Sequence, residues 1–310
     1  MDQTTKREFI DRYRSMIDEV IGIKYPVRMI LRVVDYSSAA YYSVTLGDRQ
    51  GKRGPVTLIA DTELKIAIKE TMKSIPFHGT GYKKIHARMQ RELLKKGHSV
   101  GKNRVFRLMK EDDLLNKAPG GSGSGRIHDG RITTESPKVM WGTDGKKFFT
   151  RRDGWCWFFD VADHFNSELI GYNVVKYGDR FEATRAVQNA IMNCYGCLEE
   201  GTAKGLIVRC DLGSQYTSDY FKNTMKFYGI EVSYSWARSP ECNGIIERFH
   251  RTIDDQLFKM NDFESIEEAV EAIRIFIALY NDQWQLERLN YKSPIEVMKE
   301  YNMLSLKNAC

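Results

Sequence analysis

Residues 206–218 read LIVRCDLGSQYTS, a short apolar run followed directly by an acidic residue. A short, nearly continuous apolar run is typical of a strand that is covered on both faces. Helical periodicity at 181–194 and 218–228 supplies helices on either side of it in the chain. The stretch therefore predicts an α/β core in which Asp211 stands at the end of a strand.

The strand pattern continues outward from this stretch in both directions. Three earlier apolar runs, joined by short turns, predict an antiparallel meander at 139–149, 155–161 and 169–175. One further strand and two amphipathic helices are predicted at 231–235, 243–258 and 266–280. The predicted element order is βββαβαβα for a core at 139–300, with a tail at 301–310.

A segment rich in Gly and Ser separates this core from the residues before it. Residues 119–125 read PGGSGSG and have no side chain that can join a core, so we expect a flexible linker at 119–138. Residues 1–118 have helical periodicity, and two predicted helices around the turn at 35–36 have helix-turn-helix spacing. We therefore expect an all-α region in front of the α/β core.

The charge is divided unequally between the two regions. Residues 1–119 hold 24 Lys and Arg against 14 Asp and Glu, whereas residues 139–310 hold 20 against 25. A basic helical region favours nucleic-acid binding, although a solvated helical bundle remains an alternative. The candidate DNA contacts on its predicted helices are Lys83, Lys84, Arg88, Arg104 and Arg107.

The composition excludes two classes of protein. With 42% hydrophobic and 28% charged residues, the chain is not intrinsically disordered. No apolar stretch approaches the roughly 20 residues that a membrane span needs, and the N-terminus lacks the apolar run of a secretory signal. We expect a cytoplasmic protein without a membrane segment.

Three acidic residues are the candidate catalytic groups. Asp144 follows an apolar run, Asp211 follows another, and Glu247 lies in the first turns of a predicted helix. Carboxylates brought together repel one another unless cations compensate them. Two Mg²⁺ or Mn²⁺ ions, which prefer oxygen ligands, would do so and would support displacement at a phosphodiester.

The segments around these acids closely resemble the integrase-like DDE transposases of bacterial insertion sequences, which are relatives of retroviral integrases. The segments that carry the resemblance are WGTD at 141–144, DLGSQYTS at 211–218 and SPECNGIIE at 239–247. Residues 81–86 and 103–109 are similar to the helical DNA-binding region that precedes such cores. The resemblance implies an RNase H-like core in which Asp144, Asp211 and Glu247 bind two Mg²⁺ ions, with Mn²⁺ able to substitute.

The resemblance also implies an activity and partners. Such a transposase nicks the ends of its element and joins the 3′-hydroxyl ends to target DNA. It binds double-stranded DNA, both the terminal inverted repeats and the target, as a homodimer or larger oligomer near the bacterial nucleoid. Further candidate DNA contacts are Gln215, Asn243, Arg248 and Arg251, with turn and N-cap roles left open for Gln215 and Asn243.

Two other functions remain possible from the sequence. A structure-selective nuclease with an RNase H-like core would cut DNA without joining it. A domesticated DNA-binding regulator would have lost catalysis. That alternative requires that one of the three acids be missing, whereas all three are present.

Overall fold

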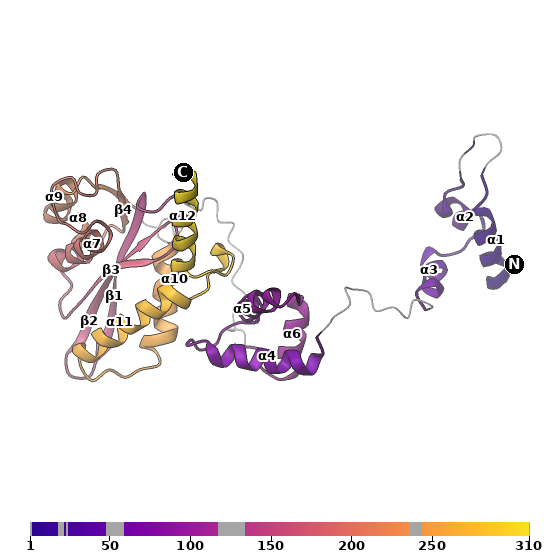
Figure 1. The fold of residues 1–310 in the computed structure, drawn as a ribbon, viewed down its shortest axis with the longest axis horizontal. Helices are drawn as coiled ribbons and strands as arrows, with labels where there is room; N and C mark the ends of the chain where they lie inside the picture. The colour runs from indigo at the N-terminus through magenta and orange to yellow at the C-terminus, as the bar shows by residue number, and fades with distance from the viewer. Residues whose placement is uncertain are drawn as a thin grey trace. The chain divides into compact units, whose positions relative to one another are not determined.

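The computed structural model describes residues 2–17, 22, 24–47, 59–116, 134–235 and 244–309. The chain divides into two compact units, Met1–Leu58 and Ile59–Cys310 (Figure 1). Residues 119–133 of the linker predicted at 119–138 lie outside the described residues. The larger unit holds both the sheet and the helices at 61–111, which the sequence pattern assigns to the region before the linker.

The smaller unit contains three helices around a small apolar core. They are α1 (Gln3–Tyr13), α2 (Val27–Val33) and α3 (Ser38–Gly47). Asp2 caps α1 by accepting the Thr5 N–H at 2.7 Å. The core consists of Ile10, Ile30, Leu31 and Tyr41.

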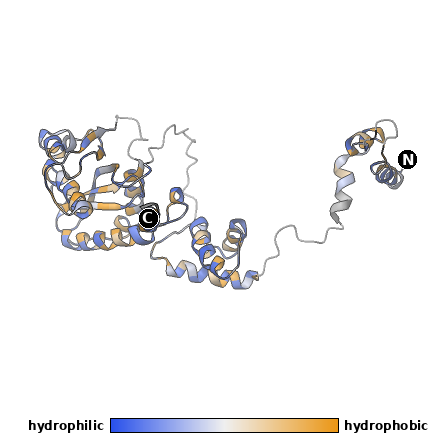
Figure 2. Cartoon of the chain, turned by 45° about the horizontal axis from the view of Figure 1, so that its top comes forward, coloured by the Kyte–Doolittle hydropathy of each residue, from blue (hydrophilic) through white to orange (hydrophobic). Residues whose placement is uncertain are grey.

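The larger unit begins with three amphipathic helices, whose apolar sides face one another (Figure 2). They are α4 (Asp61–Ser74), α5 (Tyr82–Lys95) and α6 (Lys102–Glu111). Apolar residues at helical spacing form their shared core, which includes Leu64, Ile68, Ile85, Met89, Val105 and Leu108. The helices predicted from periodicity in this part of the chain are confirmed.

A five-stranded sheet follows, with the strand order β3-β2-β1-β4-β5. Its strands are β1 (Met140–Thr150), β2 (Gly154–Asp163), β3 (Leu169–Val175), β4 (Ile207–Cys210) and β5 (Glu231–Tyr234). The first three pair in antiparallel fashion, whereas β4 is parallel to both β1 and β5. These strand directions and this order are those expected of an RNase H-like core.

Helices cover both faces of the sheet (Figure 1). One face packs against α7 (Arg180–Tyr195), α8 (Ser214–Thr217) and α9 (Asp219–Phe227). The other packs against α10 (Gly244–Ile253), the π-helical turn η1 (Asp254–Phe258) and α11 (Ile266–Gln283). The chain ends with the 3₁₀ turn η2 (Glu287–Leu289) and α12 (Pro294–Ala309), so residues 301–309 continue a helix where the sequence pattern left a tail.

Small residues let α7 lie directly on the sheet. A Cβ atom at Gly171 of β3 would lie 2.5 Å from the backbone nitrogen of Ala190 and 2.7 Å from the carbonyl oxygen of Ala186. Only glycine fits this approach, because no side-chain rotation relieves a clash with backbone atoms. The close packing fixes the three antiparallel strands against α7.

In the part of the chain that the structure describes, no helix is both long and apolar enough to cross a bilayer.

Candidate catalytic site

The register between β1 and β4 brings two of the predicted acids together. Trp141 lies opposite Val208 and Gly142 lies opposite Arg209 in this parallel pair. Two residues further along each strand stand Asp144 and Asp211, on neighbouring strands at the same level. Asp211 follows the end of β4 as predicted, but Asp144 lies inside β1, because β1 continues beside β2 beyond the point where β4 stops.

Asp144 is a desolvated carboxylate in a negatively charged neighbourhood. Burial raises the pKa of Asp144 to about 6, and the carboxylates of Asp160 and Asp211 add to this effect. His250 and the Gly145 N–H, which donates to Asp144 Oδ1 at 2.7 Å, act in the opposite direction. The remaining unfavourable charge makes this pair of acids a suitable place for a hard divalent cation.

A buried acid and a histidine that the sequence analysis did not select complete this side of the site. Asp160 lies directly opposite Asp144 in the β1–β2 pair and is fully buried. Nε2 of His250 lies 2.7 Å from Asp160 Oδ1, and its Nδ1 lies 3.6 Å from Asp144 Oδ2. Burial by itself would lower the pKa of His250, but these carboxylates outweigh it and raise that pKa. An acidic residue inside the apolar run at 155–161 was the available signal.

Glu247 lies on the helix that carries this histidine. It is half-buried and precedes His250 by three residues, so the two side chains lie on the same side of α10. The helix packs on the sheet through Ile246, Phe249 and Ile253. Within the described ranges, no group of three or more His, Cys, Asp or Glu side chains is close enough to hold a metal ion. The structure thus brings Asp144 and Asp211 to the same level on neighbouring strands. His250 connects the helix that carries Glu247 to Asp144.

Several of the basic residues predicted to contact DNA lie in ion pairs within the chain. The pairs are Lys83 with Glu287 at 2.9 Å, Arg104 with Asp61, and Arg107 with Asp61 and Glu111 at 2.6 Å each. A DNA phosphate would compete with these carboxylates for the cations.

The other predicted contacts have different surroundings. Lys84 is held above the Trp284 ring, and Arg248 and Arg251 are exposed on α10; all three side chains line one cavity. Arg88 on α5 and Gln215 on α8 are half-buried. Asn243 lies outside the described residues.

The raised pKa of Asp144 has a consequence for stability. The folded chain binds this proton at pH values where an unfolded Asp, with its ordinary pKa of 3.8, has released it. The stability that this proton contributes is therefore present below about pH 4 and lost as the pH rises through about 6. One pKa unit corresponds to about 1.4 kcal/mol, so the loss is on the order of 3 kcal/mol.

Asp144→Asn lacks this titration, so we expect it to stabilise the metal-free chain relative to wild type, by an amount that grows as the pH rises. Urea unfolding of both proteins in EDTA between about pH 4 and pH 7 measures the difference. A difference that does not change with pH would contradict the assigned environment of Asp144.

The chain is similar to known integrases and transposases. Residues 228–294 match the family described as Integrase core domain. The chain is 28% identical over 170 residues to the transposase for insertion sequence element IS904 of Lactococcus lactis subsp. lactis (strain IL1403), which covers 54% of this chain and 63% of that protein. It is 26% identical over 245 residues to transposase InsD for insertion element IS2A/D/F/H/I/K of Escherichia coli. This match covers 77% of this chain and 79% of that protein. The resemblance to integrase-like transposases that the motifs predict is confirmed.

Two solved structures are also similar. The catalytic core domain of BIV integrase is 17% identical and matches over 55% of this chain and 99% of its own, with a TM-score of 0.40. The HTLV-2 integrase catalytic core domain in complex with magnesium is 18% identical. It matches over 52% of this chain and 95% of its own, with a TM-score of 0.40.

Proposed function

We propose that the chain is a DDE transposase that nicks the ends of an insertion sequence and joins the 3′-hydroxyl ends to target DNA. The observation that carries this proposal is the strand register that places Asp144 level with Asp211 on neighbouring strands. The similarity to two insertion-sequence transposases supports the same reaction.

Two Mg²⁺ ions held by Asp144, Asp211 and Glu247 would supply activation of the attacking hydroxyl and stabilisation of the departing oxygen, and Mn²⁺ would replace them. Two backbone N–H groups and one side chain of the protein set the positions of these ligands. The Gly145 N–H orients Asp144, and the Gly213 N–H donates to Asp211 Oδ1 at 2.9 Å. His250 holds α10, and with it Glu247, against β1 and β2.

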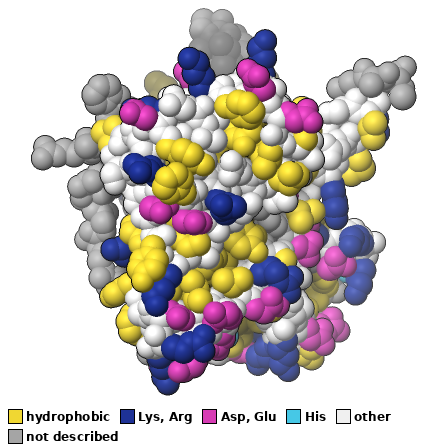
Figure 3. Space-filling model, turned by 90° about the vertical axis from the view of Figure 1, so that its left-hand side faces the viewer, with side chains coloured by type: hydrophobic (Ala, Val, Ile, Leu, Met, Phe, Trp, Pro, Cys, Tyr) yellow, Lys and Arg dark blue, Asp and Glu magenta, His cyan; other side chains and the backbone are white. Residues whose placement is uncertain are grey.

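The partners follow from the reaction. The chain binds the terminal inverted repeats and the target as double-stranded DNA, acts as a homodimer or larger oligomer, and works in the bacterial cytoplasm near the nucleoid. The basic excess in residues 1–119 favours this region as the main source of DNA affinity. On the face of the protein in Figure 3, Lys and Arg are interspersed with Asp and Glu, which makes this face a poor DNA-binding surface.

A strand-transfer assay tests the proposal. Labelled duplexes that carry the element's inverted repeats are incubated with the full chain in Mg²⁺, Mn²⁺, Ca²⁺ or EDTA. We expect nicked and joined products in Mg²⁺ and Mn²⁺, and DNA binding without products in Ca²⁺, because Ca²⁺ has longer bonds and looser geometry. Nicking without joining would favour the nuclease alternative. Products in EDTA would contradict metal dependence.

A further inference from the structure

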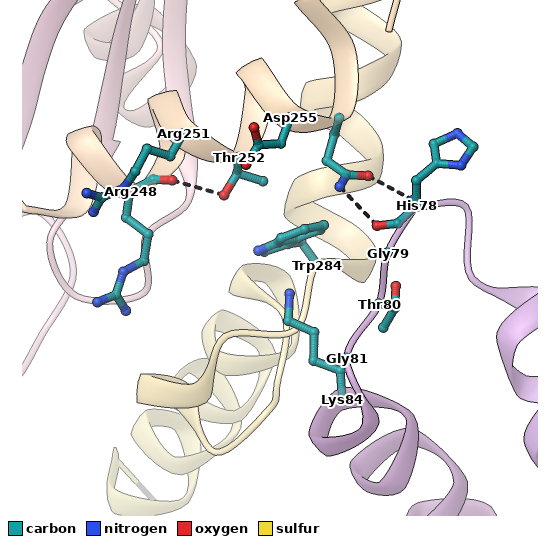
Figure 4. Close-up of a pocket in the computed structure, with 11 residues that line it drawn as sticks. His78, Gly79, Thr80, Gly81, Lys84, Arg248, Arg251, Thr252, Asp255 and Trp284 are labelled. Atoms are coloured by element: carbon teal, nitrogen blue, oxygen red, sulfur yellow. Dashed lines mark hydrogen bonds between the residues drawn. The ribbon is translucent and has the colours of Figure 1, made fainter. Parts of the chain in front are cut away.

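A cavity of about 340 Å³ lies where α5 meets the helices that cover the sheet (Figure 4). The loop at 78–81 and Lys84 form one wall, and Arg248 and Arg251 of α10 form the other. Trp284 lies between the two walls, with its ring facing Lys84. The cavity is therefore lined by residues from the helices before the sheet and from the helix that carries Glu247.

Specific contacts hold the two walls together. The side chain of Gln256 accepts the His78 N–H at 2.8 Å and donates to the His78 carbonyl oxygen at 3.0 Å. The Phe77 ring packs edge-on against Trp284 and Phe276, with centroid distances of 4.8 and 6.3 Å. These contacts fix the loop against the core, so the cavity is a built feature of this unit.

The cavity is positively charged. The Lys84 ammonium lies 3.4 Å from the centroid of the Trp284 ring, and burial lowers the pKa of Lys84 to about 8. In the described part of the chain, Lys84, Arg248 and Arg251 make no ion pair with a carboxylate. Asp255, the one carboxylate among the described lining residues, pairs with Lys259 at 2.6 Å.

Two further features bear on the charge. Glu287 is close enough to Arg248 for electrostatic interaction, but its hydrogen bond is to Lys83. The cavity wall also includes the first turn of α5, whose N-cap Gly81 has no side chain to satisfy the free N–H groups. The N-terminus of a helix adds partial positive charge. A bound anion would offset the cost of a desolvated ammonium.

We propose that this cavity binds one phosphodiester group of the DNA strand next to the scissile linkage, with Lys84, Arg248 and Arg251 as its ligands. The inference rests on the proposed function. Arg251 follows Glu247 by one helical turn, which separates their Cβ atoms by roughly 5–6 Å. Both side chains lie on one side of α10, so a phosphate bound at Arg251 would belong to a nucleotide near the scissile linkage. Lys84 makes the helices before the sheet part of the catalytic site.

A DNA-binding experiment with single neutral linkages tests this site. Fluorescence anisotropy measures the Kd of the full chain for an element-end duplex in metal-free buffer, for wild type, Lys84→Gln, Lys84→Arg and the control Lys95→Gln. Lys95 is exposed near the other end of α5 and pairs with Glu92. The duplexes carry one methylphosphonate each, at successive linkages near the cleavage site. Melting curves check that each variant is folded.

We expect Lys84→Gln to raise Kd about tenfold or more on unmodified DNA, because it removes a charged hydrogen bond to phosphate. Lys84→Arg and Lys95→Gln should stay within about twofold of wild type. The Lys84→Gln penalty should vanish on the one duplex whose neutral linkage occupies the cavity. A penalty that persists on every duplex, or a Lys84→Gln that behaves like Lys95→Gln, would overturn the site and leave the proposed function standing. Failure of wild type to bind the duplex would overturn both.

Discussion

Replacement of Asp144 or Asp211 by Asn, or of Glu247 by Gln, is expected to lower nicking and joining at least about 1,000-fold, since each removes a ligand of the reacting centre. Binding of element-end DNA in Ca²⁺ should change by less than about fivefold, because the basic residues that supply affinity remain in place. Single-turnover gel assays measure the rates, and anisotropy measures Kd.

A matched control separates this effect from a general loss of negative charge. Asp219 is exposed in the first turn of α9, eight residues beyond Asp211. Asp219→Asn should keep the rate within about twofold of wild type. Substantial strand transfer by any two of the three acid variants would show that these carboxylates are not the catalytic set.

His250→Ala is expected to impair both stability and rate. It leaves the fully buried Asp160 carboxylate without its 2.7 Å partner, which costs about 3 kcal/mol or more in the free energy of unfolding. It also removes the contact with Asp144, and loss of such an outer-shell partner typically lowers metal affinity or activity about 10–100-fold. Urea unfolding and strand-transfer rates over a Mg²⁺ series measure the two effects.

The double variant Asp160→Asn/His250→Ala distinguishes a positioning role from a purely structural one. Removal of the Asp160 charge should restore much of the lost stability, because no unpaired carboxylate then remains buried. The Mg²⁺ concentration for half-maximal rate should stay raised, since Asp144 still lacks its imidazole contact. A double variant with the wild-type Mg²⁺ dependence would limit His250 to stabilising the fold.

The sequence predicts the strands and helices of the core and the position of Asp211 directly after a strand. The sequence alone shows that an apolar run ends at the carboxylate of Asp211, and the order of strands and helices follows from the periodicity of apolar residues. Asp160 could not be predicted as part of the site, because its position opposite Asp144 depends on the pairing register of β1 and β2. The alternation of side chains along a strand does not fix that register. The cavity could not be predicted from the sequence either, because Lys84 and Trp284 come into contact only through tertiary packing.

The π-helical turn after α10 has a consequence for how this chain tolerates insertions and deletions. The wider turn, closed by the Lys259 N–H and the Asp254 carbonyl oxygen at 2.9 Å, accommodates one more residue than an α-helical turn. Its side chains contact two segments. Asp254 pairs with Lys146 at 2.7 Å and Phe258 stacks on Phe148, both in β1, while Gln256 binds the loop at His78.

Deletion of one residue at 254–258 would replace the wide turn by an α-helical one and change the directions of the side chains within it. Glu247 would keep its place on the sheet, while Gln256 in the middle of the turn would lose its contacts with His78. The catalytic helix and its attachment to α5 are thus set by separate stretches of one continuous helix, so a single-codon deletion could uncouple the helices before the sheet from the reaction while sparing the acids.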